Sequence, residues 1–275
     1  MNNFVTRTLS SVVYVAVMVS SVLVHPVAFG VVFCAISMWA VYEFMHLQQA
    51  PNYLKIGAMI AGGILFASLW SWHNVPVDIR VLLLSSIIAY MAVSMVLIVT
   101  ELFAKQANPI ANWGLFAQSQ CMVALPFALM NVVMMKCPYL LLALFICIWI
   151  NDAGAYIIGS LMGKRKGGNH KMFPRVSPAK SWEGLAGGVL FTLVAGVVFY
   201  SIGWMQNLGF ALTFAAIASV AGTLGDLVES LMKRTIGVKD SGFFLPGHGG
   251  VLDRFDSLLL ATPAICVFLF VCWLV

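Results

Sequence analysis

Apolar residues occur along this chain in long runs, separated by short polar segments, from near the first residue to the last. The runs are about 20 residues long, which is the length that a helix needs to cross a hydrocarbon core of about 30 Å. Backbone groups inside a bilayer must be hydrogen-bonded within the protein, so the runs predict helices. The nine predicted spans are Thr8–Val24, Val27–Phe44, Ile56–Trp70, Val81–Thr100, Leu115–Met135, Tyr139–Met162, Gly184–Trp204, Phe210–Met232 and Phe255–Val275.

The pattern predicts an all-α, polytopic transmembrane protein built as one integral membrane unit. Residues 1–140 are plain apolar spans, whereas residues 141–275 hold most of the polar side chains. Pro126 and Pro263 fall inside spans and are expected to kink them, which membrane helices tolerate when neighbouring groups satisfy the freed carbonyls. The composition also indicates a membrane protein, because only 9% of the residues are charged, against about 25% in soluble domains.

Lysine and arginine predict the orientation of the spans, because cytoplasmic loops carry an excess of both. The segments after spans six and eight are the most basic, and two spans separate them, so both are expected in the cytoplasm together with the N-terminus. Of the 15 Lys and Arg residues, only Arg80 and Lys136 fall on the other side. No basic domain stands free of the membrane, so we expect no nucleic-acid partner. The basic residues of the two segments are Lys164, Arg165, Lys166, Lys171, Arg175 and Lys180, then Lys233, Arg234, Lys239 and Arg254.

Acidic residues within membrane spans are costly and are functional candidates by default. Asp226, Glu229 and Ser230 are spaced i, i+3 and i+4 in span eight, so they share one helix face. The alternative is that Lys233 or a proton neutralises Asp226. Asp152 lies late in span six, where Asn151 and Asp152 interrupt the apolar run.

Asp253 and Asp256 form a second acidic pair at the entry to span nine, three residues apart. On a helix both carboxylates point the same way, and they repel each other unless a proton or a cation lies between them. Carboxylates that share ligation of Mg²⁺ with substrate phosphates are one common solution. The alternative is a helix N-terminus with acids that the helix dipole favours.

The connection between these acidic pairs alternates basic residues and glycines. His248 is flanked by Gly249 and Gly250, and glycine lets backbone N–H groups approach an anion closely. A flexible turn explains the same residues equally well. In the loop after span six, Ser181 is expected to cap span seven, and Ser177, Lys180 and Ser181 are also candidates to bind phosphate.

The segment Ser230–Asp256 closely resembles the signature of the phosphatidate cytidylyltransferase (CDP-diacylglycerol synthase) family. It reads S-L-M-K-R-T-I-G-V-K-D-S-G-F-F-L-P-G-H-G-G-V-L-D-R-F-D. Three upstream pieces also resemble the family: N-D-A-G-A-Y-I-I-G-S-L-M-G-K, S-P-A-K-S-W-E-G and G-D-L-V-E-S. The resemblance covers roughly the last 125 residues, and the stretch Lys166–Pro174 departs from it by being longer and more basic.

The resemblance implies a nucleotidyltransferase that converts CTP and phosphatidic acid to CDP-diacylglycerol and pyrophosphate with Mg²⁺, a second cation and a homodimer being left open. It implies an integral protein of a bacterial cytoplasmic membrane whose catalytic region is residues 141–275. The alternatives are another membrane lipid phosphotransferase or a cation transporter. The implied metal ligands are Asp226, Asp253 and Asp256, with Glu229 and Asp152 as further candidates. The implied phosphate-facing residues are Lys233, Arg234, Lys239, His248 and Arg254, and the implied nucleotide- or lipid-phosphate-binding residues are Ser177, Lys180, Ser181, Gly249 and Gly250.

Overall fold

The computed structural model describes residues 3–74, 79–106, 108–164, 168–242 and 249–274. Eight helices in this part of the chain are long and apolar enough to cross a membrane. The remaining predicted span, Thr8–Val24, lies within α1 (Asn3–Val24), where the apolar helix Ser11–Val24 is shorter. The predicted all-α, polytopic architecture is therefore confirmed, while the orientation of the spans stays a prediction.

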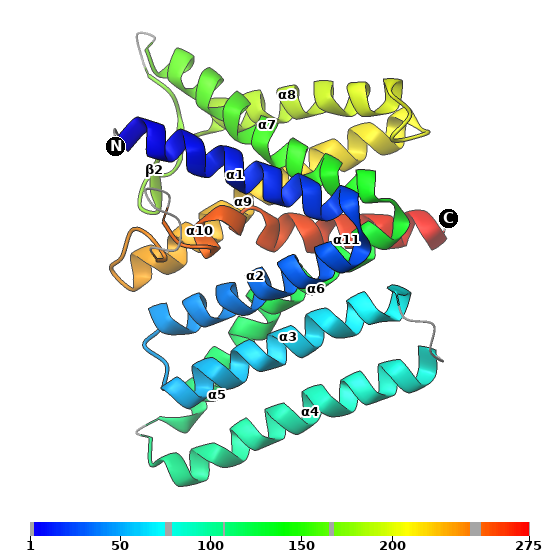
Figure 1. Ribbon diagram of the computed structural model, residues 1–275. Coiled ribbons are helices and arrows are strands. Elements are labelled where there is room, and N and C mark those ends of the chain that lie inside the picture. Colours follow the sequence, from blue (N-terminus) through cyan, green and yellow to red (C-terminus); the bar gives the residue numbers. More distant parts are fainter. Residues whose placement is uncertain (1–2, 75–78, 107, 165–167, 243–248, 275) are drawn as a thin grey trace. The chain divides into compact units, whose positions relative to one another are not determined.

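The chain divides into two compact units, residues 1–135 with 240–254, and residues 136–239 with 255–275. In the first unit α2 packs on α3 and α3 packs on α4, and the three helices run side by side in Figure 1. The aromatic rings of Phe29, Phe33 and Phe66 meet in the core of this unit. Its elements are α1, α2 (Pro26–Leu47), α3 (Asn52–Asn74), α4 (Ile79–Ala104), α5 (Pro109–Ser119), the π-helix η1 (Gln120–Ala124), α6 (Leu125–Lys136) and α10 (Leu252–Phe255).

The predicted fifth span is interrupted by the π-helical turn η1, which directly precedes Pro126. Proline cannot donate the i→i−4 hydrogen bond and clashes with the preceding turn, and a π-bulge is one known response of a helix to such a local irregularity. Gln120 in this turn donates from Nε2 to the Ala58 carbonyl oxygen at 3.1 Å. The turn is thereby joined to α3.

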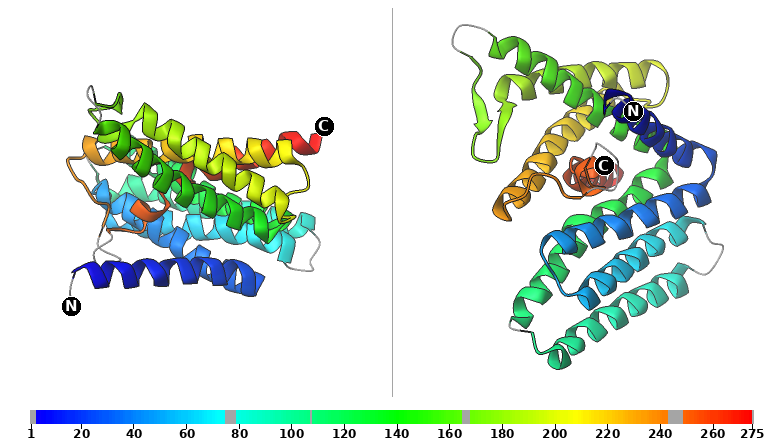
Figure 2. Two further views of the ribbon diagram at one scale, coloured as in Figure 1. Left: turned by 90° about the horizontal axis from the view of Figure 1, so that it is seen from above. Right: turned by 60° about the vertical axis from the view of Figure 1, so that its left-hand side comes forward.

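The second unit packs α8 between α7 and α9, and α9 against α11. Its elements are α7 (Pro138–Gly163), β1 (Lys171–Phe173), β2 (Ser177–Ser181), α8 (Trp182–Ser201), α9 (Leu208–Thr235) and α11 (Leu258–Leu274). The strands form an antiparallel hairpin, drawn in yellow-green between α7 and α8 in Figure 2, with Lys171 opposite Ser181. The sequence analysis did not predict this hairpin.

A buried amide joins α7 to α9. Asn151 donates from Nδ2 to Thr223 Oγ1 at 3.1 Å and accepts from the Ser219 hydroxyl. Gly188 of α8 lies so close that a Cβ there would overlap the Asn151 side chain. The apolar run of span six is interrupted at Asn151 because this polar side chain is fully satisfied inside the unit, where an unpaired polar group would be costly.

The ninth predicted span is not one continuous helix. The chain leaves α10 at Phe255 and resumes helix at Leu258, so Asp256 and Ser257 lie in a break. Gly225 of α9 approaches the break so closely that a Cβ there would meet the Asp256 carbonyl oxygen at 2.6 Å. The expectation that Asp253 and Asp256 lie on one helix face is therefore wrong, because the helix that would align them ends between them.

Candidate functional site

A cavity of about 260 Å³ opens within the second unit, between α7, β2, α8 and α9. Its wall combines charged and apolar side chains, including Tyr156, Met172 and Leu185. The other polar residues that line it are Asn151, Asp152, Lys180, Ser181, Thr223 and Asp226. Ionisable groups from three separate segments of the sequence therefore face one space inside a bundle of membrane-spanning helices.

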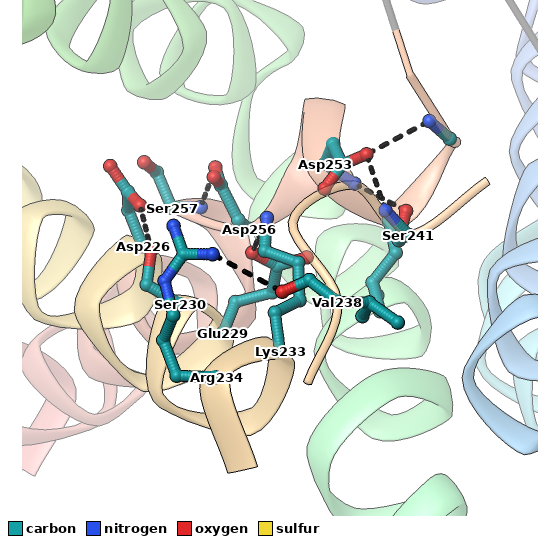
Figure 3. Close-up of polar contacts among 12 residues, drawn as sticks. Asp226, Glu229, Ser230, Lys233, Arg234, Val238, Ser241, Asp253, Asp256 and Ser257 are labelled. Carbon is teal, nitrogen blue, oxygen red and sulfur yellow. Dashed lines mark hydrogen bonds and ion pairs between the residues drawn. The ribbon is translucent and has the colours of Figure 1, made fainter. Parts of the chain in front are cut away.

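The wall of this cavity contains an ion pair between Lys180 and Asp226. Lys180 Nζ lies 2.6 Å from Asp226 Oδ2 and donates to the Thr223 carbonyl oxygen at 3.3 Å. The Ser230 hydroxyl donates to Asp226 Oδ1 at 3.2 Å (Figure 3), which is consistent with the predicted shared helix face of these two residues. Among the described residues, the cation that pairs with Asp226 is thus Lys180 of the hairpin and not Lys233.

Lys233 pairs instead with Glu229, one turn away on α9. The Glu229 carboxylate is fully buried, and a buried carboxylate is tolerated when a cation pairs with it. Glu229 therefore shares the predicted helix face with Asp226 and Ser230, but it forms a separate ion pair.

Asp152 and Asp256 add negative charge near Asp226. The Asp226 carboxylate repels the carboxylates of both residues, and Asp256 Oδ1 accepts from the Ser257 amide at 2.5 Å. Like charges that lie this close favour a bound cation. The Lys180 ammonium supplies positive charge beside Asp226 and Asp152, and the Lys233 ammonium supplies it near Asp256.

Three further predicted residues have structural contacts in this unit. Arg234 donates to the Val176 and Val238 carbonyl oxygens, at 3.4 and 3.2 Å. Ser181 accepts from the Gly184 amide at 3.1 Å, which confirms it as the N-cap of α8. Ser177 begins β2.

In the first unit, the connection that follows α9 folds around Asp253. Asp253 Oδ2 accepts from the Ser241 and Gly250 amides, at 2.8 and 2.9 Å (Figure 3). Gly249 adopts a φ of +81°, a region that favours glycine, and a Cβ there would overlap the Asp253 carboxylate. Gly249 and Gly250 thus form a tight turn around a carboxylate of the protein itself.

Glu43 of α2 is a second carboxylate at this turn, and sequence analysis missed it. Its side chain is buried, at 6% exposure. Oε2 accepts from the Val251 amide at 2.9 Å, and Oε1 accepts from the Leu252 amide at 3.3 Å and from the Ser241 hydroxyl. Of the two glycines predicted to bind an anion, Gly250 donates its amide to Asp253, while the amides of the next two residues, Val251 and Leu252, donate to Glu43. The sequence does contain a signal for Glu43, because it is an acidic residue near the end of the second apolar run, and acids within spans are functional candidates.

The other predicted residues of the connection are exposed or undescribed. Lys239 and the Arg254 side chain are exposed, and the Arg254 carbonyl oxygen accepts from the Tyr14 hydroxyl at 3.4 Å. His248 lies outside the described residues, as do residues 165–167 of the basic stretch near the hairpin.

The oxygen atoms in the cavity fit the chemistry of Mg²⁺, which prefers carboxylates, water and substrate phosphates. Asp152 and Asp226 line the cavity beside the side chains of Asn151 and Thr223. Across the described ranges, no three His, Cys, Asp or Glu side chains are gathered tightly enough to hold a metal ion. The cavity therefore fits an ion that takes part of its ligation from a bound phosphate.

Comparison with known proteins shows the family to which this chain belongs. A sequence model described as "Cytidylyltransferase family" matches residues 5–272, so the chain belongs to the cytidylyltransferase family.

The similar curated proteins are phosphatidate cytidylyltransferases. The one from Staphylococcus haemolyticus (strain JCSC1435) is 46% identical over 132 residues, which is 48% of each chain. The one from Staphylococcus aureus (strain COL) is 45% identical over the same length and share. The matched stretch thus spans about half the length of these relatives.

Proposed function

We propose that this protein is a phosphatidate cytidylyltransferase, which transfers a cytidylyl group from CTP to the phosphate of phosphatidic acid. The observation that carries the proposal is the cavity with the Lys180–Asp226 ion pair among membrane-spanning helices. A lipid phosphate and a nucleotide triphosphate are both polyanions, and this cavity offers them a cation and carboxylates suited to Mg²⁺. The names of the staphylococcal relatives support the lipid substrate.

The reaction exchanges one phosphoanhydride bond for another. An oxygen of the phosphatidate phosphate forms a bond to the α-phosphorus of CTP, while the bond from that phosphorus to the oxygen bridging to the β-phosphorus breaks. Pyrophosphate leaves with the bonding electrons, and CDP-diacylglycerol remains. The attacking oxygen is already anionic, so no strong general base is needed, and the main barrier is repulsion between the two substrates.

Cationic side chains lower that repulsion. The Lys180 ammonium lies within the cavity, and we propose that it moves its hydrogen bonds from Asp226 to a substrate phosphate. Preorganised positive charge at developing negative charge is commonly the largest catalytic contribution. Arg234, whose guanidinium bridges two backbone carbonyls, keeps the hairpin that carries Lys180 beside α9.

Asp152, Asp226 and Asp256 are the residues in the second unit that we propose to hold Mg²⁺. For Asp253, which belongs to the first unit, the resemblance to the family signature supports a proposed role as a metal ligand. Bound Mg²⁺ supplies charge neutralisation for the phosphates and the leaving pyrophosphate. Ser230 contributes by fixing one Asp226 oxygen through its hydrogen bond. Both basic segments, and with them the cavity, are proposed to face the cytoplasm of a bacterial cell.

The proposal is tested by assaying the purified protein in detergent with radiolabelled CTP and phosphatidic acid. Lipid labelling that requires both substrates and Mg²⁺ is expected. Asp226→Asn and Asp253→Asn are each expected to lower kcat by roughly 10²–10³-fold, with folding retained by thermal unfolding. Glu101→Gln, which alters a buried carboxylate bound to Tyr53 and Asn112, is the matched control. Folded wild-type protein that labels no lipid would refute the proposal.

A further inference from the structure

We infer that Glu43 of α2 is a positioning residue for the reaction, one that holds the connection carrying Asp253 and Arg254. The inference rests on the proposed function, because it assigns a catalytic purpose to the order of that connection. It also assigns a role to the N-terminal spans, for which the sequence motifs predict none.

Hydrogen bonds, and not packing alone, join the Glu43 side chain to the connection. Its carboxylate accepts hydrogen bonds from the Val251 amide, the Leu252 amide and the Ser241 hydroxyl. All three donors lie about 200 residues further along the chain. Hydrogen bonds to a charged acceptor are stronger than neutral ones, and the buried carboxylate needs them to offset its desolvation.

The backbone at Gly250 and Gly242 approaches the Glu43 carboxylate closely. A Cβ at Gly250 would overlap Glu43 Oε1, and a Cβ at Gly242 would meet the Glu43 carboxyl carbon at 3.0 Å. Glycine at these two positions lets the connection close on the carboxylate. The fit is specific to an acceptor, since the groups that point at it are N–H and O–H donors.

Ser241 links Glu43 to Asp253. The Ser241 hydroxyl donates to Glu43 and accepts from the Asp253 amide at 3.3 Å. The Ser241 amide donates in turn to the Asp253 carboxylate at 2.8 Å. Removal of the Glu43 charge therefore loosens the hydrogen bonds that orient Asp253.

Glu101 provides a matched comparison in the same unit. It is also buried, at 3% exposure, and its carboxylate accepts from the Tyr53 hydroxyl and the Asn112 amide. Neither partner belongs to the connection. Glu101→Gln thus reproduces the chemical change of Glu43→Gln away from Asp253.

The first test follows backbone order by hydrogen–deuterium exchange of the detergent-solubilised protein without substrates. Glu43→Gln is expected to speed exchange of the Val251 and Leu252 amides by roughly tenfold to a hundredfold, because each loses a charged acceptor. Glu101→Gln is expected to leave these amides at the wild-type rate. If Glu43→Gln fails to fold, Ser241→Ala, which removes one of the three donors to Glu43 and the acceptor of the Asp253 amide, is expected to show the same change to a smaller extent.

The second test separates positioning from general destabilisation. Glu43→Gln is expected to raise the Mg²⁺ concentration for half-maximal activity several-fold and to lower kcat, with partial recovery in Glu43→Asp. A purely structural defect reduces the amount of active protein and leaves the Mg²⁺ dependence unchanged. The inference is overturned if wild-type protein is active while Glu43→Gln matches Glu101→Gln in exchange and in Mg²⁺ dependence. An inactive wild type would instead refute the proposed function.

Discussion

Lys180 and Asp226 form an ion pair that bears on both the stability of the protein and the proposed binding of substrate. Their side chains are 22% and 30% exposed, so water screens the pair only in part. Breaking one half of a partly buried pair leaves the other charge without its partner, whereas removing both halves avoids that penalty. The pair thus contributes to stability as well as to the proposed chemistry.

Stability measurements on Lys180→Met, Asp226→Asn and the double variant test this contribution. We expect Lys180→Met to lower the melting temperature in detergent, because Asp226 and Asp152 lose their nearby cation. The double variant is expected to recover part of the loss, with a coupling energy of about 1 kcal/mol.

The exposed His170–Glu183 pair serves as the control for this cycle, since its His170 side chain is 86% exposed and exposed pairs contribute little. Additive effects at Lys180 and Asp226, within the scatter seen for His170 and Glu183, would contradict the coupling.

At the residue scale, the features that could be predicted from the sequence involve residues close together along one helix. The shared helix face of Asp226 and Ser230 and the Ser181 cap were predicted from the sequence, and a hydrogen bond in the structure confirms each of them. Glu43 was missed because its donors are about 200 residues away. Lys180 was selected as a candidate, but the hairpin decides that Asp226 is its partner.

At the scale of elements, the hairpin β1–β2 and the helix break at Asp256 are the features that the apolar pattern does not reveal. The strands hold three and five residues, too few to show a periodicity. The break follows four helical residues of α10, and its two residues, Asp256 and Ser257, are equally compatible with the first turn of one continuous helix. The hairpin places Lys180 in the wall of the cavity, and the break brings Asp256 close to Gly225 of α9.

Ser181 joins the hairpin to α8, and its two candidate roles predict different mutational behaviour. Ser181→Ala is expected to destabilise the protein by about 1 kcal/mol, because the Gly184 amide loses its acceptor. Ser181→Asn restores a capping side chain, so it is expected to recover stability. Thermal unfolding and the lipid-labelling assay measure the two effects.

Recovery of both stability and activity in Ser181→Asn would identify Ser181 as a cap alone. Recovery of stability without activity would support the predicted contact of its hydroxyl with a substrate phosphate.

At the scale of the whole molecule, the distribution of lysine and arginine predicts the side on which each loop lies. Cysteines introduced on a background without the six native cysteines provide the test. Gln206→Cys, between α8 and α9, is expected to react with a membrane-impermeant thiol reagent in intact cells. Arg175→Cys, in the turn of the hairpin, is expected to react only after the membrane is opened. Both positions are exposed, so the reverse result would invert the predicted orientation.

The sequence by itself determined that this is a multi-span helical membrane protein, roughly where eight of its spans lie, and which segment carries the family signature. These properties follow from local composition and from spacing along single helices, because a bilayer forces each apolar run to satisfy its own backbone. Tertiary structure alone decided that Lys180 pairs with Asp226 and that Glu43 holds the turn before Asp253. Such contacts join residues far apart in the sequence, and they depend on how close glycines such as Gly225 and Gly250 let the backbone approach.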